Sequence, residues 1–215
     1  MTVSALYGRG SGGRLAVLLL ALSFGTGPAA GAARLQSTRG LLDRLRSTGR
    51  AEAAVETTVE DLLGGKARTV RGRLVLELPH FARLDFPEHE SLTLREDGGD
   101  WLQPHTRQLL RSGPESAEAA MRWSAVLLAS GAGEVRERPM AGGGFELSRA
   151  GPDSARAERQ RVWLGADGYP ARLEIVNPSG ERRTYRLSGW KFSRARGRAA
   201  FVLRAPAGFE VVDLP

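Results

Sequence analysis

The sequence predicts a mainly β protein whose antiparallel sheet curls toward a barrel. About ten short segments alternate apolar and polar residues, which is typical of strands with one buried face. Turn sequences containing Gly, Pro or Asp separate these segments at regular spacing, as in antiparallel sheets and barrels. Two stretches, residues 35–47 and 115–129, instead have apolar residues at helical spacing, so we expect two helices beside the sheet.

Residues 1–32 have the three parts of a secretory signal peptide. Arg9 and Arg14 flank the start of an apolar run, Leu15–Phe24, which is too short to span a bilayer as a helix. Ala30-Gly31-Ala32 fits a small-x-small cleavage site, so we expect cleavage near Ala32 and export to the periplasm. The alternative interpretation is a buried hydrophobic helix near the start of a cytosolic domain.

The remaining residues, 33–215, are expected to form one soluble domain of roughly 180 residues, long enough to bury its own core. The chain has no cysteine, so we expect neither disulfides nor a cysteine-linked lipid anchor. No later segment is apolar enough to span a membrane.

The charge of the chain argues against nucleic acid as a partner. The formal net charge is +7, and it falls to +5 without Arg9 and Arg14. The basic residues are almost all arginines interspersed with acids, and the one dense basic stretch, Lys191–Arg198, has a single aromatic residue. The positive charge is better explained by attraction to anionic membrane surfaces or to acidic proteins.

The first strands are predicted from period-two alternation. A half-buried strand is expected at residues 55–59, and a clearer one follows the Gly64-Gly65 turn. On this second strand one face carries Val70, Gly72, Leu74, Leu76 and Leu78. The opposite face carries Arg71, Arg73 and Glu77, with Val75 as the exception. Further strands are expected at residues 82–86, 92–94, 100–102 and 108–111.

After the helix at residues 115–129, which Gly131–Gly133 ends, the strand pattern resumes. Strands are expected near Val135 and at residues 145–147, 161–164, 172–176, 184–187 and 200–203. Turns at Asp167-Gly168 and Pro178-Ser179-Gly180 separate the later ones.

The order of several short motifs resembles the outer-membrane lipoprotein carrier family, the periplasmic LolA-type chaperones. Leu76-Glu77-Leu78-Pro79 is followed by Phe81–Pro87, by Glu90–Leu94, by Asp97-Gly98 and by Trp101. Near the end, Phe201–Asp213 is similar to the closing Phe-x-x-x-x-Pro-x-Gly-x-x-Val-x-Asp signature of the family. The resemblance spans most of residues 33–215, and its order is more specific than any single motif.

This resemblance implies an incomplete, strongly curved antiparallel β-barrel with a helical lid. It implies a carrier that encloses acyl chains of lipoproteins, or another lipid, and acts as a monomer. An inner-membrane ABC transporter would supply the cargo and an outer-membrane acceptor would receive it. Residues 115–129 are the candidate lid, in which four apolar side chains would face the cavity: Met121, Trp123, Leu127 and Leu128. The apolar strand faces would line the cavity: Leu74, Leu76, Leu78, Leu84, Phe86, Leu92, Leu94, Trp101, Phe145, Leu147, Leu173, Ile175, Phe201 and Leu203.

One position departs from the pattern of the family. Members often carry an arginine immediately before the proline that ends the second strand, where it holds the lid closed. This chain has Leu78 there, so control of the lid and the identity of the cargo are open.

Two other classes of function are alternatives. An enzyme is disfavoured, because His80, His89 and His105 lack metal-ligand spacing and no Gly-x-Ser-x-Gly motif is present. We expect neither a metal nor a cofactor. The third possibility is a periplasmic sensor or scaffold of the same fold that binds a protein partner through its sheet and carries no lipid.

Overall fold

The computed structural model describes residues 35–59, 68–87, 89–120, 124, 127–128, 135–149, 158–176 and 182–214. All of them belong to one compact unit, Ala32–Pro215. The expected signal peptide and two of the expected lid residues, Met121 and Trp123, lie outside the described residues.

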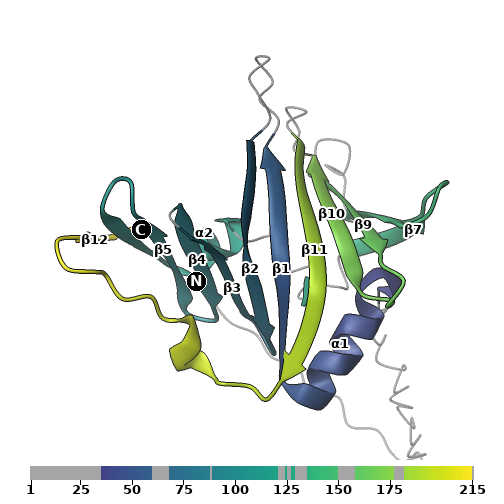
Figure 1. Ribbon diagram of the computed structural model, residues 1–215, viewed down its shortest axis with the longest axis horizontal. Helices are drawn as coiled ribbons and strands as arrows, with labels where there is room; N and C mark the ends of the chain where they lie inside the picture. The colour runs from purple at the N-terminus through teal and green to yellow at the C-terminus, as the bar shows by residue number, and fades with distance from the viewer. Residues whose placement is uncertain are drawn as a thin grey trace, which may run out of the picture. The chain divides into compact units, whose positions relative to one another are not determined.

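The described residues of this unit form one twelve-stranded sheet (Figure 1). In spatial order the strands run β12-β6-β5-β4-β3-β2-β1-β11-β10-β9-β8-β7. Their bounds are β1 Arg50–Val59, β2 Arg68–Glu77, β3 Phe81–Phe86, β4 Glu90–Arg95, β5 Gly98–Gln103, β6 Gln108–Ser112, β7 Val135–Pro139, β8 Phe145–Arg149, β9 Arg159–Leu164, β10 Pro170–Val176, β11 Arg182–Ser193 and β12 Glu210–Asp213.

The sheet is curved and does not close. β7 and β12 end the strand order, and they do not pair with each other among the described residues. All neighbouring strands are antiparallel except β12, which runs parallel to β6. The mainly β, incompletely closed architecture that the sequence predicts is confirmed.

Strand register gives the sheet an apolar face and a charged face. Leu74 of β2 lies opposite Ala53 of β1 and Leu84 of β3, and all three are buried. Arg73, the preceding residue, lies opposite Ala54 and Asp85 on the other side. Because side chains alternate along a strand, this register continues across the sheet. We call the side of Leu74 the inner face and the side of Arg73 the outer face.

The helix α1 (Gln36–Thr48) covers part of the inner face and confirms the expected helix near the start of the domain. Leu41 and Leu45 are one helical turn apart and pack into the same cluster as the inner-face leucines. Its first turn is held by a distant carboxylate: Glu137 of β7 accepts hydrogen bonds from the backbone N–H of Gln36 (2.6 Å) and Ser37 (2.8 Å). An acid at this end complements the positive end of the helix.

The helix α2 (Pro114–Ala120) covers the inner face at β4 and β5. Gly99 of β5 makes this close approach possible, because a Cβ atom there would lie 2.8 Å from the Cβ of Ala117 and 2.4 Å from the Thr93 carbonyl oxygen. Leu127 is also helical, as the expected helix over residues 115–129 requires.

The chain end differs from the sequence prediction. Residues 200–203 do not form a strand, and the short helix η3 (Arg198–Phe201) stands in their place. The backbone N–H of Leu203 donates to the Asp100 carboxylate (2.9 Å) rather than to a neighbouring strand. Residues 194–209, which we call the C-terminal segment, run from the lower end of β11 to β12, as the yellow chain in Figure 1 shows. The sequence analysis also missed the strand β12.

Candidate functional site

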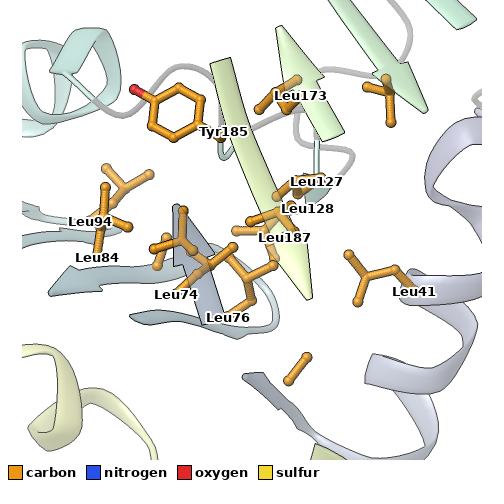
Figure 2. Packing of buried hydrophobic residues seen from close by; sticks show 14 of the residues in the cluster. Leu41, Leu74, Leu76, Leu84, Leu94, Leu127, Leu128, Leu173, Tyr185 and Leu187 are labelled. Carbon is orange, nitrogen blue, oxygen red and sulfur yellow. The ribbon is translucent and has the colours of Figure 1, made fainter. Parts of the chain in front are cut away.

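The inner face carries one continuous cluster of buried apolar side chains. β2 and β3 contribute Leu74, Leu76, Leu84 and Phe86, and β10 contributes Leu173 and Ile175 from the other half of the sheet. Figure 2 shows Leu74, Leu76 and Leu187 close together, with Leu173 above them. The structure therefore brings most of the residues expected to line a cavity into one cluster, namely Leu74, Leu76, Leu84, Phe86, Leu94, Leu147, Leu173 and Ile175, with Leu78 and Leu92 packed against it.

The described part of the candidate lid packs on this cluster. Leu127 is 0% exposed and Leu128 5% exposed, and both belong to the cluster, as does Ala117 of α2. In Figure 2 both leucines lie beside Leu187. Ala117, Leu127 and Leu128 thus pack directly against the apolar face of the sheet.

Trp101 and Phe145 lie at the margins of the inner face. The register places Trp101 opposite Leu92, but its side chain is 36% exposed and its Nε1–H donates to the Glu90 carboxylate (2.8 Å). Phe145 lies opposite Val162, and it is half-buried. Neither residue belongs to the buried cluster, although both share its face.

Phe201 and Leu203 do not join the inner-face cluster. Phe201 stacks on Phe81 with ring centroids 5.3 Å apart, and its carbonyl oxygen accepts from Arg95 (2.9 Å). Phe81 lies opposite Glu77, which is one residue out of step with Leu76 and so faces outward. Phe201 and Leu203 therefore belong to the C-terminal segment and contact the outer face of the sheet. The expectation that they line the same face as Leu76 is corrected, because residues 200–203 cross the sheet instead of joining it.

The strand β11 contributes residues that the sequence analysis did not single out. Tyr185 and Leu187 alternate on its inner face and belong to the cluster. Burial raises the pKa of the Tyr185 phenol above its ordinary value of 10.0, and the neighbouring Arg183 opposes part of this rise. Tyr185 and Leu187 alternate with Thr184 and Arg186 in the sequence, and this alternation could have identified them.

A buried polar side chain with an unsatisfied oxygen lies within this apolar face. Gln160 of β9 is buried between Leu147 and Ile175. Its Nε2 donates to the Glu158 carboxylate (2.8 Å), and its Oε1 has no hydrogen-bond partner in the described part of the chain. This oxygen can accept a hydrogen bond from a ligand or a water molecule.

The described residues contain no group of three or more His, Cys, Asp or Glu side chains able to hold a metal ion. His80 and His105 are exposed in turns. No helix within the described ranges is long and apolar enough to cross a membrane.

Neither a protein-family model nor a curated protein matches this sequence. Among solved structures, the chain is similar to an uncharacterised conserved protein from Thermus thermophilus (16% identity, TM-score 0.45, covering 83% of this chain and 99% of that chain). It is also similar to a DUF1329 family protein from Desulfovibrio piger (12%, 0.45, 78% and 95%). A third similar structure is a LolA superfamily protein from Nitrosomonas europaea (10%, 0.41, 78% and 98%). At these identities and TM-scores, the similarities assign neither a family nor a function.

Proposed function

We propose that this protein is a soluble carrier that encloses acyl chains against the inner face of its sheet. The observation that carries the proposal is the cluster itself. It runs across β1–β4 and β8–β11, and in the described part of the chain it is helical segments that cover it. Helices that are joined to a sheet only through side-chain contacts can separate from it without breaking strand pairing.

The driving force would be the burial of acyl methylene groups. Each methylene removed from water contributes about 0.8 kcal/mol. One long acyl chain therefore supplies ample affinity, and release is the harder step. The candidate lid assists release, because Leu127 and Leu128 occupy the same apolar surface and compete with the ligand for it.

The finer proposal follows from the sequence resemblance. It includes removal of residues 1–32, action in the periplasm as a monomer, and transfer of lipoproteins or another lipid from the inner to the outer membrane. The donor would be an ABC transporter and the acceptor an outer-membrane protein. The carrier would need neither a metal nor a cofactor, and it would not act as an enzyme.

A fluorescent fatty-acid probe tests the proposal on two adjacent residues of β2. Leu76 (inner face) and Val75 (outer face) are equally buried, so Leu76→Glu and Val75→Glu place the same charge on opposite faces at similar cost to the fold. We expect Leu76→Glu to abolish probe binding and Val75→Glu to retain it. Equal binding by both variants would show that the inner face is not the ligand site.

A milder variant covers the case in which both of these proteins fail to fold. Leu92 lies on the inner face but is only half-buried, so Leu92→Glu leaves the core intact. Probe affinity should fall several-fold, while thermal unfolding changes little. Unchanged affinity in this folded protein would contradict the proposal.

The direction in which probe affinity changes tests the role of the lid. Leu128→Ala weakens the closed state, so the fraction of molecules open to the ligand rises and probe affinity should increase. A decrease in affinity would show that Leu128 supports the bound state rather than competing with it.

A protein-binding scaffold is the second candidate function, and one observation favours it. The protein itself buries the cluster residues almost completely, so the inner face already forms a packed core. Native mass spectrometry of protein purified from its own envelope separates the two functions. Bound lipid supports the carrier. Lipid-free protein that takes up no probe supports the scaffold.

A further inference from the structure

The outer face of the sheet carries an ordered array of arginines from β2 to β7. The register places these side chains on one surface because β1, β11, β10, β9 and β8 continue the alternation that begins at Arg71 and Arg73. The outer-face arginine array consists of Arg71, Arg73, Arg136, Arg138, Arg159, Arg161, Arg172, Arg182 and Arg186.

About half as many acids contact the array, and each is contacted by more than one arginine. They are Glu52, Glu56, Glu146 and Glu174 on the same strands and Asp85 of β3, whereas Glu77 at the end of β2 is buried against Arg50. Glu56 accepts from Arg71 (3.1 Å) and lies 3.5 Å from Arg186. Glu174 lies 3.1 Å from Arg161 and 2.8 Å from Arg172. Sharing of one carboxylate between two guanidinium groups leaves positive charge over at each site.

This surplus charge faces solvent. The side chains of Arg71, Arg138 and Arg186 are 85%, 77% and 71% exposed. Each guanidinium has five N–H donors, and a single contact to a carboxylate leaves most of them directed at water. Arg172 lies directly opposite Arg186, with its guanidinium carbon 4.5 Å from the centre of the Trp163 ring. The array is therefore able to receive anionic groups from outside.

We propose that the outer-face arginine array docks the protein on an anionic phospholipid surface. Charge complementarity indicates an anionic partner. Trp163 lies on this face but is half-buried against the Arg172 guanidinium, so no large hydrophobic side chain is exposed as an anchor among the described outer-face residues, which favours a membrane over a protein. Specific protein interfaces are centred on buried aromatic or aliphatic side chains. Among the described residues, the exposed large hydrophobic side chains are Trp101, Leu164, Val202, Val211 and Leu214, and none of them belongs to the outer-face positions of β2, β1 and β11–β7. Basic side chains alone suffice to attract a protein to anionic lipid headgroups.

This docking places the inner face away from the bilayer, so the acyl-binding site and the docking surface use opposite sides of one sheet. The inference does not depend on the proposed carrier function, since it rests on side chains that the inner-face site does not use.

A triple variant of the array tests the proposal. Arg71→Gln, Arg138→Gln and Arg182→Gln remove three exposed charges, and every glutamate keeps another arginine: Glu56 keeps Arg186, Glu146 keeps Arg161, and Glu174 keeps Arg161 and Arg172. The matched control removes three exposed arginines that lie off this face, by Arg39→Gln, Arg107→Gln and Arg204→Gln. Both variants have the same net charge.

Binding is measured by flotation with vesicles of phosphatidylcholine, with and without phosphatidylglycerol, at low and high salt. We expect the unmodified protein to bind only the anionic vesicles and to dissociate as salt rises. The array variant should bind on the order of 100-fold more weakly at low salt, because each basic residue near the surface contributes about fivefold. The control variant should lose much less.

Any of three results with vesicles would overturn the docking proposal. They are no preference of the unmodified protein for anionic vesicles, unchanged binding by the array variant, or an equal loss in the control variant, which would reflect net charge alone. Array-dependent binding to an acidic polypeptide without binding to vesicles would indicate a protein partner and would also overturn it. Fatty-acid probe uptake should be the same in all three proteins. If none of the three proteins takes up the probe, the carrier function is contradicted, but the docking result is unaffected.

Discussion

The outer face has two halves that use the same alternation of charged residues in opposite ways. The C-terminal segment covers β3–β5 and the Glu77 end of β2, where buried acids accept hydrogen bonds from it. The remaining strands and the Arg71–Arg73 part of β2 form the open half. Glu77 is 1% exposed and accepts hydrogen bonds from Arg50 (2.8 Å) and from the backbone N–H of Arg196 and Gly197 (both 3.0 Å). On β1 and β11–β7 the glutamates have arginine side chains as partners, most of them exposed.

The two halves differ in the cost of removing a carboxylate. Backbone N–H groups of the C-terminal segment are fixed in place, so removal of their acceptor leaves buried donors without a partner. An exposed arginine whose carboxylate is removed turns to water at little cost. The covered half is therefore expected to govern stability, and the open half to govern interactions with the surroundings.

The largest effect is expected at Glu77. Glu77→Ala leaves the Arg50 guanidinium buried, with Glu52 as its remaining acidic partner, and removes the acceptor of two backbone donors. We expect the free energy of unfolding to fall by about 3–5 kcal/mol, measured by urea denaturation. Glu77→Gln keeps one acceptor oxygen and should cost less. A loss no larger than that of an exposed pair would remove the distinction between the two halves.

A smaller loss is expected at Asp100. Its carboxylate accepts from the Leu203 N–H (2.9 Å) and from Arg95 (2.7 and 3.2 Å), so it joins β5 to the C-terminal segment. Asp100→Asn should lower the free energy of unfolding by about 2 kcal/mol and speed hydrogen exchange at the Leu203 amide. Asp97→Asn is the control, since its side chain is half exposed although it contacts Arg198. Equal effects of the two substitutions would contradict the role of burial.

Glu52 lies at the border of the two halves, and its lowered pKa predicts that the stability of the protein depends on pH. Burial opposes ionisation of Glu52, but the hydrogen bond and charge of Arg50 outweigh it and lower the pKa below its ordinary value of 4.5. A group with a lowered folded-state pKa stabilises the protein above its unfolded-state pKa, and this contribution is lost as pH falls through the folded-state value. Glu52→Gln should therefore be less stable than the unmodified protein at pH 7.

The pH series is followed by denaturant unfolding of both proteins. The stability difference should shrink below pH 4.5 and vanish at more acidic pH. A difference that stays constant with pH would show that the charge of Glu52 contributes nothing, and that the change reflects packing alone.

The smallest effect on stability is expected in the open half. The Arg71 side chain is 85% exposed, and Glu56 retains Arg186 after its removal. Arg71→Gln should change the free energy of unfolding by no more than about 0.5 kcal/mol. A loss approaching that of Asp100→Asn would show that the arginines of the open half hold the sheet together, and would weaken the case for a docking surface.

The sequence predicted most strands and the helix α1 correctly, because period-two and helical spacing report which side chains are buried. Leu74 and Leu76 alternate with Arg73 and Glu77, and that alternation places them on opposite faces in the structure. The prediction failed for residues 200–203, where Phe201 and Leu203 are spaced as in a strand but no neighbouring strand pairs with them among the described residues. A short apolar alternation does not distinguish a strand from a segment that crosses a sheet.

The candidate site, like the fold, was predicted in part. Alternation predicted that the leucines of β2, β3 and β10 face inward. The same alternation predicted a strand at residues 184–187, but Tyr185 and Leu187 were not proposed as cavity residues. Trp101 shares the inner face by register, yet its bond to Glu90 holds it at the margin, which spacing does not reveal.

Local spacing determines the two faces of this sheet, because each residue in a strand is committed to one side of it. It does not determine what lies over each face. Val75 and Glu77 are both buried although they lie on the charged face. The burial of Glu77 is explained by a segment more than a hundred residues away, whose Arg196 and Gly197 backbone N–H groups donate to its carboxylate. The same long-range packing separates the covered half from the open arginine array, since burial of a charge depends on which distant segment excludes water from it.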